Sequence, residues 1–253
     1  MTEHALLADL FRDDLVYEER CCLFLDVLGF SRLLKHSEAS VVFHMLTYFK
    51  EGKEKFFPYA DEDTQVTAFS DSIVISINSR ERTCIHSMIE VATQLQKDFM
   101  QIGILTRGGI ALGKMFHKDG ILFGPAMVEA YTLESEIAVY PRVVVSEKAV
   151  IKYHEFLAEF TPVENQALAD KFRRDFDGVI HVHIFDQTAY EPLDPQFPSF
   201  ELELDSDEVV RRVMLGRPVG DDKETKRIQT KYDWLESYYY QSNRDSQTQN
   251  LDV

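Results

Sequence analysis

Apolar residues recur with two different periods along the chain, and each change of period marks an expected element. A continuous apolar run over residues 21–28 is typical of a buried strand. Paired runs rich in β-branched residues, each interrupted by a short polar turn, predict hairpins over residues 65–77 and 105–123. Two further runs, at 141–146 and 179–185, predict two more strands.

Apolar residues spaced three and four apart predict helices between these strands. The expected helical segments are residues 1–18, 31–57, 82–101, 124–133, 147–160 and 206–240. This order predicts an α+β fold, with helices on one side of a mixed sheet and a helical C-terminal extension. We divide the chain into an N-terminal helix (1–19), a central domain (20–190), and a linker with the C-terminal extension (191–253).

The C-terminal extension is highly charged, but part of it is apolar. Its helical pattern is interrupted near residues 216–220, and the second half carries Trp234, Leu235 and three tyrosines at 238–240. A free tail would not expose so much apolar surface. We therefore expect the extension to dock on a partner and complete a dimer, with residues from Gln241 onward frayed.

The composition limits the possible partners. Hydrophobic residues make up 45% of the chain, which is enough for a full core, and the net charge is −16. An acidic surface disfavours nucleic acids and anionic membranes. A phosphorylated substrate would need a locally neutralised site, built from metal ions or placed cations. Without a signal-peptide pattern or an apolar run of ~20 residues, we expect a cytoplasmic protein.

Several other residue sets are interpreted as structural. Cys21, Cys22 and Cys84 form no Cys-x-x-Cys pair, so we expect reduced core cysteines. His181 and His183 alternate on one predicted strand face, but no third metal ligand lies nearby, which favours core packing.

A cluster of acids in the extension is also interpreted as structural. Asp205, Asp207 and Glu208 precede a helical pattern. Carboxylates are favourable at the positive end of a helix dipole, so we expect a solvated helix start.

Two acids interrupt strand-like sequence. Asp26 ends the first strand, and Asp71 lies at the tip of the first hairpin. If that hairpin is central, both carboxylates emerge at the same end of the sheet. Two close carboxylates repel unless a cation lies between them, and paired divalent ions ~3.5–4 Å apart are the usual device for phosphoryl transfer. The alternative stays open: Asp26 as a helix-capping acid and Asp71 as a turn former.

The same stretches resemble a known family. Phe24–Ser31 resembles the first metal motif of class III nucleotidyl cyclases, and Phe69–Ser72 resembles the second, with the two acids 45 positions apart. Arg107–Gly113 resembles the fourth-strand motif of the family. Phe123–Ala130 resembles the segment that leads from a strand into the following helix. The resemblance covers roughly residues 20–150.

This resemblance implies a class III cyclase-like sheet with a ferredoxin-like core. It also implies cyclisation of a nucleoside triphosphate to the 3′,5′-cyclic monophosphate, with pyrophosphate leaving. Two divalent metal ions, manganese or magnesium, would be bound by Asp26, Asp71 and the carbonyl of Val27. Cyclases of this class act as dimers with the site between protomers, so the resemblance implies a homodimer.

The resemblance further implies where the phosphates bind and which cation helps. Phosphates would be bound by the backbone N–H groups of Gly29, Phe30 and Ser31, with Ser31 as the expected N-cap of the next helix. The family's helix Asn and Arg are absent from Val128–Glu134, so another cation must stabilise the transition state. Arg107 is the nearest candidate, unless it is a structural strand arginine. Arg142 and Lys114 are alternatives.

The base-recognition positions also depart from the family. Thr67 stands where purine-specific relatives have Lys or Glu, and Ile121 stands where adenylate cyclases have Asp. The variant is similar to the bacterial pyrimidine cyclases of the Pycsar antiphage systems, whose cyclic UMP or cyclic CMP activates a separate effector. We expect UTP as substrate, with CTP open. Thr67 and Tyr48 are candidates for the base pocket, although Tyr48 also fits a core position.

A rival hypothesis is a catalytically silent, cyclase-like module that binds a nucleotide or a protein partner. The missing helix Asn and Arg motivate it. The retained pair of acids opposes it, because a close carboxylate pair is unfavourable without a cation.

Overall fold

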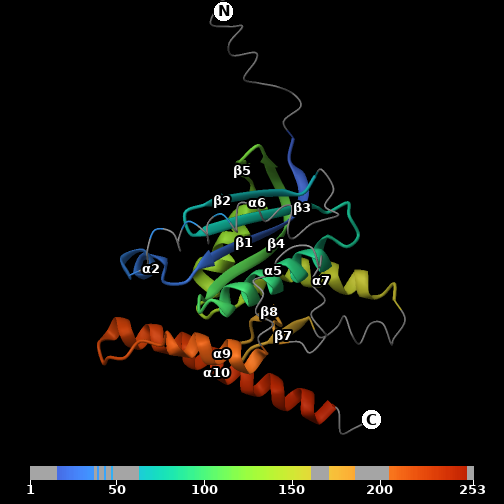
Figure 1. The fold of residues 1–253 in the computed structure, drawn as a ribbon. Helices are drawn as coiled ribbons and strands as arrows, with labels where there is room; N and C mark the ends of the chain where they lie inside the picture. The colour runs from blue at the N-terminus through green and yellow to red at the C-terminus, as the bar shows by residue number, and fades with distance from the viewer. Residues whose placement is uncertain are drawn as a thin grey trace, which may run out of the picture.

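The computed structural model describes residues 16–36, 39, 43, 47, 63–160, 171–185 and 205–249. Within this part of the chain, eight strands form one mixed sheet (Figure 1). The strands are β1 (Glu18–Val27), β2 (Gln65–Phe69), β3 (Ser72–Asn78), β4 (Thr106–Lys118), β5 (Ile121–Phe123), β6 (Val143–Val145), β7 (Phe172–Arg174) and β8 (Ile180–Val182).

The strand order confirms the predicted fold class. The sheet runs β2-β3-β1-β4-β6-β8-β7, and β5 pairs with β4. The first four strands, in the order β2-β3-β1-β4 and all antiparallel, form a ferredoxin-like core. β6 joins β4 in parallel, and the strands beyond it are antiparallel again.

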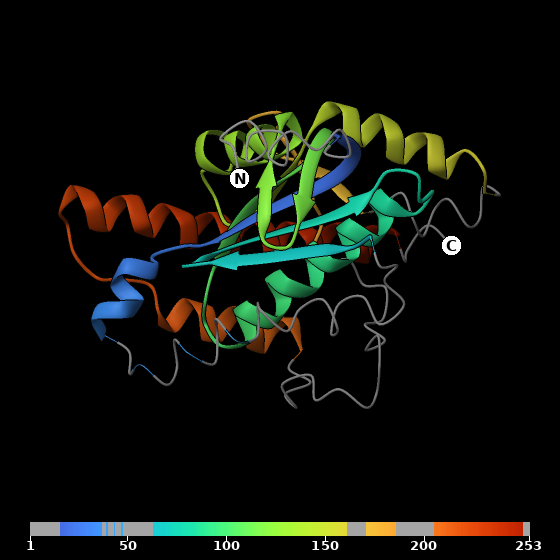
Figure 2. The same ribbon diagram turned by 90° about the horizontal axis from the view of Figure 1, so that it is seen from above.

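The helices lie on both faces of the sheet, whereas the sequence pattern predicted one (Figure 2). Those described over several turns are α2 (Phe30–His36), α5 (Cys84–Gln101), α6 (Pro125–Thr132), α7 (Glu147–Leu157), α9 (Ser206–Leu215) and α10 (Lys223–Gln249), with a π-helical turn η1 (Leu133–Ile137) after α6. Helices α5, α7, α9 and α10 share one large core with the sheet, and α6 packs against the opposite face.

The helix on the unexpected face is α6, and its small side chains explain why the sequence pattern did not predict this face. Its buried residues are Ala126 and Ala130, which pack against Cys22 and Phe24 of β1. Alanines give a weak hydrophobic period, so the pattern does not indicate which face they cover. Gly109 of β4 completes this contact, because a side chain there would collide with the α6 backbone.

Two boundaries near the N-terminus differ from the prediction. β1 begins at Glu18, so the end of the expected 1–19 helix is a strand, and residues 1–15 lie outside the described part. Helix α2 begins at Phe30 after Gly29, whose φ is +78°, so Ser31 is not the N-cap.

Strand β7 at Phe172–Arg174 lies between the predicted helix over 147–160 and the predicted strand over 179–185, where the pattern predicted no element. The linker at 191–198 lies outside the described residues. Asp205 caps α9 by accepting from the Glu208 N–H at 2.8 Å, which confirms that this acidic cluster starts a helix.

The C-terminal extension packs on its own domain, and its expected part in a dimer stays a prediction. Trp234, Leu235 and Tyr239 are buried in the same core as β1 and α5. Helix α10 continues to Gln249 rather than fraying from Gln241. Trp234, Leu235 and Tyr239 are therefore satisfied within one chain, whereas Tyr240 is 56% exposed.

Cys21, Cys22 and Cys84 are buried free cysteines, as predicted. Burial raises the pKa of the Cys84 thiol to about 11, which makes it a poor nucleophile at neutral pH. None of the helices in the described ranges is both long and apolar enough to cross a membrane.

Gly109→Ala is expected to destabilise the fold by about 1–3 kcal/mol, because the new methyl group overpacks the α6 contact. Its Cβ would lie 2.3 Å from the Ala130 carbonyl oxygen, which is backbone and cannot move aside. Gly113→Ala is the matched control, since its nearest neighbour, Ala126 Cβ, is 3.7 Å away. Urea denaturation of both variants measures the difference, and equal stabilities would contradict this account of α6.

Candidate functional site

The pairing of β1 with β3 brings Asp26 and Asp71 to the same end of the two strands, where β1 ends and β3 begins. Asp26 lies opposite Ser72, whose hydroxyl donates to Asp26 Oδ1 at 3.2 Å. The N–H of Val27 donates to the carbonyl oxygen of Asp71 at 3.1 Å. Burial raises the pKa of Asp26, and the Asp71 charge raises it further, against a lowering by Arg107. The two acids that the sequence pattern singled out therefore interact electrostatically.

Arg107 and Glu134 complete the charged cluster. Arg107 lies opposite Asp26 in the β1–β4 ladder, with its Nε 3.9 Å from Asp26 Oδ2. The same Nε is 2.7 Å from Glu134 Oε1, a close ion pair. Arg107 also donates to the carbonyl oxygen of Ala138 at 3.5 Å. The arginine thus bridges two carboxylates from different elements.

Glu134 was missed by the sequence analysis, although a signal was present. It lies in η1, four residues after Ala130 and eight after Ala126, so it continues the buried face of α6. Only 3% of it is exposed. Burial raises its pKa to about 7, with Asp26 and Asp71 adding to the rise and Arg107 opposing it. A carboxylate with such a pKa is half protonated near neutral pH.

The predicted phosphate-binding turn follows the first acid directly. The carbonyl oxygen of Gly29 accepts from the N–H groups of Arg32 at 2.9 Å and Leu33 at 3.0 Å, which starts α2. Phe30 is buried and Ser31 is exposed. The turn therefore lies at the same strand end as Asp26, and phosphate binding by its backbone N–H groups stays a prediction.

Thr67 lies two strands away from Asp26, on the same face of the sheet. Its partner in the ladder is Val74, which in turn pairs with Phe24. Strands are ~4.8 Å apart, so about 10 Å separate the two positions across the sheet. The Thr67 hydroxyl is 2.9 Å from Nε2 of His117, so this position belongs to a polar network.

His117 links Thr67 to a buried arginine. Its Nδ1 is 2.8 Å from the Ser76 hydroxyl, and Ser76 accepts from Arg20 Nε at 2.9 Å. Burial, with the Arg20 charge added, lowers the pKa of His117 to about 4. The ring is therefore neutral at physiological pH, and each nitrogen has a hydroxyl partner.

The remaining candidates lie elsewhere or outside the described residues. Arg142 is buried and held by Asp177, with 3.1 Å from NH1 to Oδ1, and by Asp175, so it is structural. Lys114 is exposed on the opposite sheet face from Asp26. Neither one supplies the missing cation. Tyr48 lies outside the described residues.

The two histidines of the β8 segment are core residues, as the sequence favoured. His181 is buried edge-on against Trp234, with ring centroids 5.7 Å apart, and packs on Tyr238. His183 bonds to the Tyr238 hydroxyl. Burial lowers the pKa of His181 to about 4.

A cation from the C-terminal extension also acts on the acid cluster, and the sequence analysis missed it. Lys231 of α10 is half-buried. Burial and the charges of Arg107 and Arg227 lower its pKa to about 8, while Asp26 and Glu134 raise it. No sequence pattern signals this neighbour, because more than 200 residues separate Asp26 from Lys231.

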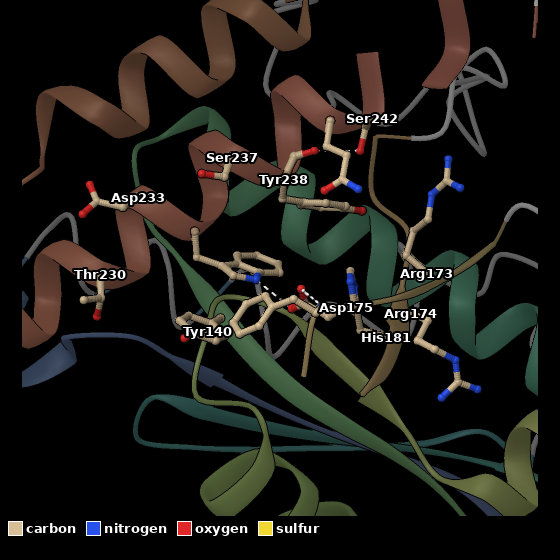
Figure 3. A pocket seen from close by; sticks show the side chains of 13 residues that line it. Tyr140, Arg173, Arg174, Asp175, His181, Thr230, Asp233, Ser237, Tyr238 and Ser242 are labelled. Atoms are coloured by element: carbon tan, nitrogen blue, oxygen red, sulfur yellow. Dashed lines mark hydrogen bonds between the residues drawn. The ribbon is translucent and has the colours of Figure 1, made fainter. Parts of the chain in front are cut away.

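A separate cavity of about 560 Å³ lies between α10 and the β7–β8 hairpin (Figure 3). The Trp234 indole donates to Asp175 at 2.7 Å and stacks on Tyr140 at 5.5 Å between ring centroids. The residues that line this cavity do not include Asp26, Asp71 or Arg107. The interactions here fasten α10 to the sheet.

The acid pair offers the donors that a hard divalent cation prefers. Both side chains are carboxylates, and oxygen ligands suit magnesium and manganese. The mutual repulsion that raises the Asp26 pKa is relieved when a cation binds between the acids. In the part of the chain that the structure describes, no group of three His, Cys, Asp or Glu side chains has metal-binding geometry. The pair therefore fits metal ions only with ligands from elsewhere, such as backbone carbonyls, water or substrate.

Comparison with known proteins finds many similar solved structures, among them the three that follow. No family model matches the chain, and no curated protein sequence matches it significantly. The guanylyl cyclase domain of RhoGC from Blastocladiella emersonii is 15% identical over 66% of this chain and 95% of that one, with a TM-score of 0.46. The adenylyl cyclase CyaB from P. aeruginosa is 15% identical over 55% and 82%, with a TM-score of 0.43.

The adenylate/guanylate cyclase/hydrolase from Silicibacter pomeroyi is 21% identical over 66% of this chain and 96% of that one, with a TM-score of 0.40. Since all three TM-scores are below 0.5 and the identities are low, these likenesses assign no activity to this chain. The fold class rests on the strand order itself.

Glu134→Gln is expected to stabilise the metal-free protein increasingly as the pH rises. The folded pKa of about 7 lies above the ordinary 4.5, so ionisation of Glu134 weakens the fold between these values. The variant should match the wild type at pH 4 and exceed it at pH 8 by on the order of 3 kcal/mol. Urea denaturation in chelator measures this, with exposed Glu129→Gln as control. A destabilised variant at pH 8 would show that the Arg107 ion pair dominates.

Proposed function

We propose that this chain is a metal-dependent nucleotidyl cyclase for a pyrimidine nucleoside triphosphate, with UTP the first candidate and CTP the alternative. The ribose 3′-oxygen attacks the α-phosphorus, the bond to the pyrophosphate oxygen breaks, and the 3′-hydroxyl proton is lost. The observation behind this proposal is the Asp26–Asp71 pair at the end of β1, followed by the Gly29 turn.

The residues of the chain divide the work of this reaction. Asp26 and Asp71, with the Val27 carbonyl, would hold the two divalent ions, which lower the pKa of the 3′-hydroxyl and neutralise phosphate charge. The backbone N–H groups of Gly29, Phe30 and Ser31 would orient the triphosphate.

Arg107 is proposed as the cation that stabilises charge on the α-phosphate. It is held 2.7 Å from Glu134 and 3.9 Å from Asp26, so it must leave a carboxylate to reach substrate. A pKa near 7 lets Glu134 become neutral when a proton binds, which weakens that ion pair. Glu134 would therefore control how available Arg107 is.

The base would be selected around Thr67. The His117 ring is neutral and within hydrogen-bond distance of the Thr67 and Ser76 hydroxyl groups, and the half-buried Thr67 keeps hydroxyl capacity for a ligand at this face. A uracil edge presents both acceptors and a donor. The lack of a charged purine-reading side chain at Thr67 supports a smaller base.

The same sheet face supports a homodimer with a composite site. Large apolar side chains are exposed on this face at the end of β2 and along α6: Phe69, Val128 and Tyr131. A patch of this kind is typical of a protein interface. The messenger role in antiphage defence rests on the sequence resemblance to Pycsar cyclases, and we propose a cytoplasmic location.

Incubation of the protein with manganese and each of the four triphosphates tests the activity and the base together. We expect cyclic UMP or cyclic CMP and pyrophosphate. Asp26→Asn should lower the rate at least about 100-fold, because metal binding contributes several kcal/mol. Asp119→Asn, in the exposed β4–β5 turn, is the control and should change little. No cyclic product from any triphosphate, or a fully active Asp26→Asn, would refute the cyclase.

Val128→Glu is expected to weaken the dimer, since it places a charge in the apolar patch on α6, where Val128 is 63% exposed. Ile151→Glu, at a 53% exposed site on α7 across the sheet, is the matched control. Light scattering across a concentration series gives the oligomeric state. A wild-type monomer at all concentrations, or a dimer that only Ile151→Glu disrupts, would contradict this interface.

The silent, nucleotide-binding module remains the second candidate. The observation that favours it is the engagement of Arg107 by two carboxylates. Calorimetry separates the candidates, because tight binding of a triphosphate without pyrophosphate release supports the module.

A further inference from the structure

The C-terminal helix α10 passes beside the acid cluster. Figures 1 and 2 both show its N-terminal half next to α2 and the end of β1. The Tyr232 hydroxyl group is within electrostatic range of Arg32 in α2, whose charge lowers the pKa of Tyr232 against the larger effect of burial. One end of the extension therefore lies where the proposed substrate binds.

Helix α10 is fastened in this position by aromatic packing. Trp234 is stacked between Tyr140, at 5.5 Å and 9° between ring planes, and Tyr238, at 5.1 Å and 27°. Its indole N–H donates to Asp175 at 2.7 Å, as the dashed line in Figure 3 shows. Tyr140 is two residues from Ala138, whose carbonyl oxygen accepts from Arg107. The same loop thus contacts both α10 and the arginine of the site.

Lys231 lies on the face of α10 that this packing turns toward the sheet. It is three residues before Trp234 and four before Leu235, which are both buried, so all three share one side of the helix. Lys231 is half-buried and forms no ion pair with any residue that the structure describes. The ammonium group of such a lysine can still donate hydrogen bonds to a ligand.

The charges around Lys231 are suited to binding an anion that carries bound metal ions. Asp26 and Glu134 attract the ammonium, whereas Arg107 and Arg227 repel it. In a chain of net charge −16, a polyphosphate needs such placed cations in addition to metal ions. Metal ions that neutralise Asp26 and Asp71 would leave Glu134 and the bound phosphates as the negative charges available to Lys231.

We propose that Lys231 of the C-terminal helix is a phosphate-binding residue, which donates to the polyphosphate chain of a metal-bound nucleoside triphosphate. This inference rests on the proposed function for the location of the triphosphate. It assigns the extension a direct part in the site, contributed by the same chain that supplies Asp26 and Asp71.

The test measures binding of inorganic tripolyphosphate, in the presence of manganese, to the full-length protein by calorimetry. Lys231→Met should weaken binding about 10- to 100-fold, the equivalent of one charge-assisted hydrogen bond. Lys231→Arg should restore most of it, since the charge remains. Lys226→Met is the matched control, because Lys226 lies on the exposed side of the same helix, 60% exposed, and 3.5 Å from Asp221.

Activity and stability measurements separate this role from others. In the cyclase assay, Lys231→Met should raise KM for the triphosphate. If Lys231 serves only as a structural counter-ion for Glu134, Lys231→Met would lower the unfolding midpoint and leave tripolyphosphate affinity within twofold, which would overturn the proposal. Failure of the wild type to bind tripolyphosphate would also overturn it.

The outcomes for the two proposals are distinct. Wild-type protein that binds tripolyphosphate through Lys231 but makes no cyclic product would refute the cyclase and leave this inference standing. A wild-type cyclase whose Lys231→Met variant binds and turns over normally would refute the inference alone.

Discussion

The register of the β1–β3 ladder is the constraint on which the candidate site depends. It places Asp26 opposite Ser72 and lets the Val27 N–H donate to the Asp71 carbonyl oxygen. Two carboxylates that are 45 positions apart in sequence therefore lie at the same end of neighbouring strands. A slip of one residue would turn Asp26 to the other face, into the large core. Every second residue from Cys21 to Val27 is buried in that core, and the loss of this burial would oppose the slip.

Around this pair the structure gathers charge from three separate segments. Arg107 comes from β4, Glu134 from η1, and Lys231 from α10, and each changes the ionisation of another. The cluster is balanced internally, with carboxylates and cations that partly satisfy one another. Binding of metal ions and an anion would replace these contacts, which couples ligand binding to the arrangement of α6 and α10.

The two faces of the sheet serve different purposes. One face, covered by α5, α7, α9 and α10, forms the main core. The other holds the acids, the Thr67–His117–Arg20 network and exposed aromatic side chains such as Phe69 and Tyr131, and among the described helices α6 covers it. Small residues at Gly109 and Ala130 let α6 approach the sheet closely.

The sequence by itself determined most of the element order and the fold class, and it singled out the two acids, because strand period, turn chemistry and helix period are local properties. Asp26 and Asp71 were conspicuous since each interrupts an apolar run. Glu134 and Lys231, the faces that α6 and α10 cover, and the engagement of Arg107 required the tertiary structure. These depend on which helix face meets the sheet and on charges far apart in the chain, and no local pattern records either. The ends of α10 and β1 were also decided by packing, since burial of Trp234 and pairing with β4 extend elements beyond their local propensity.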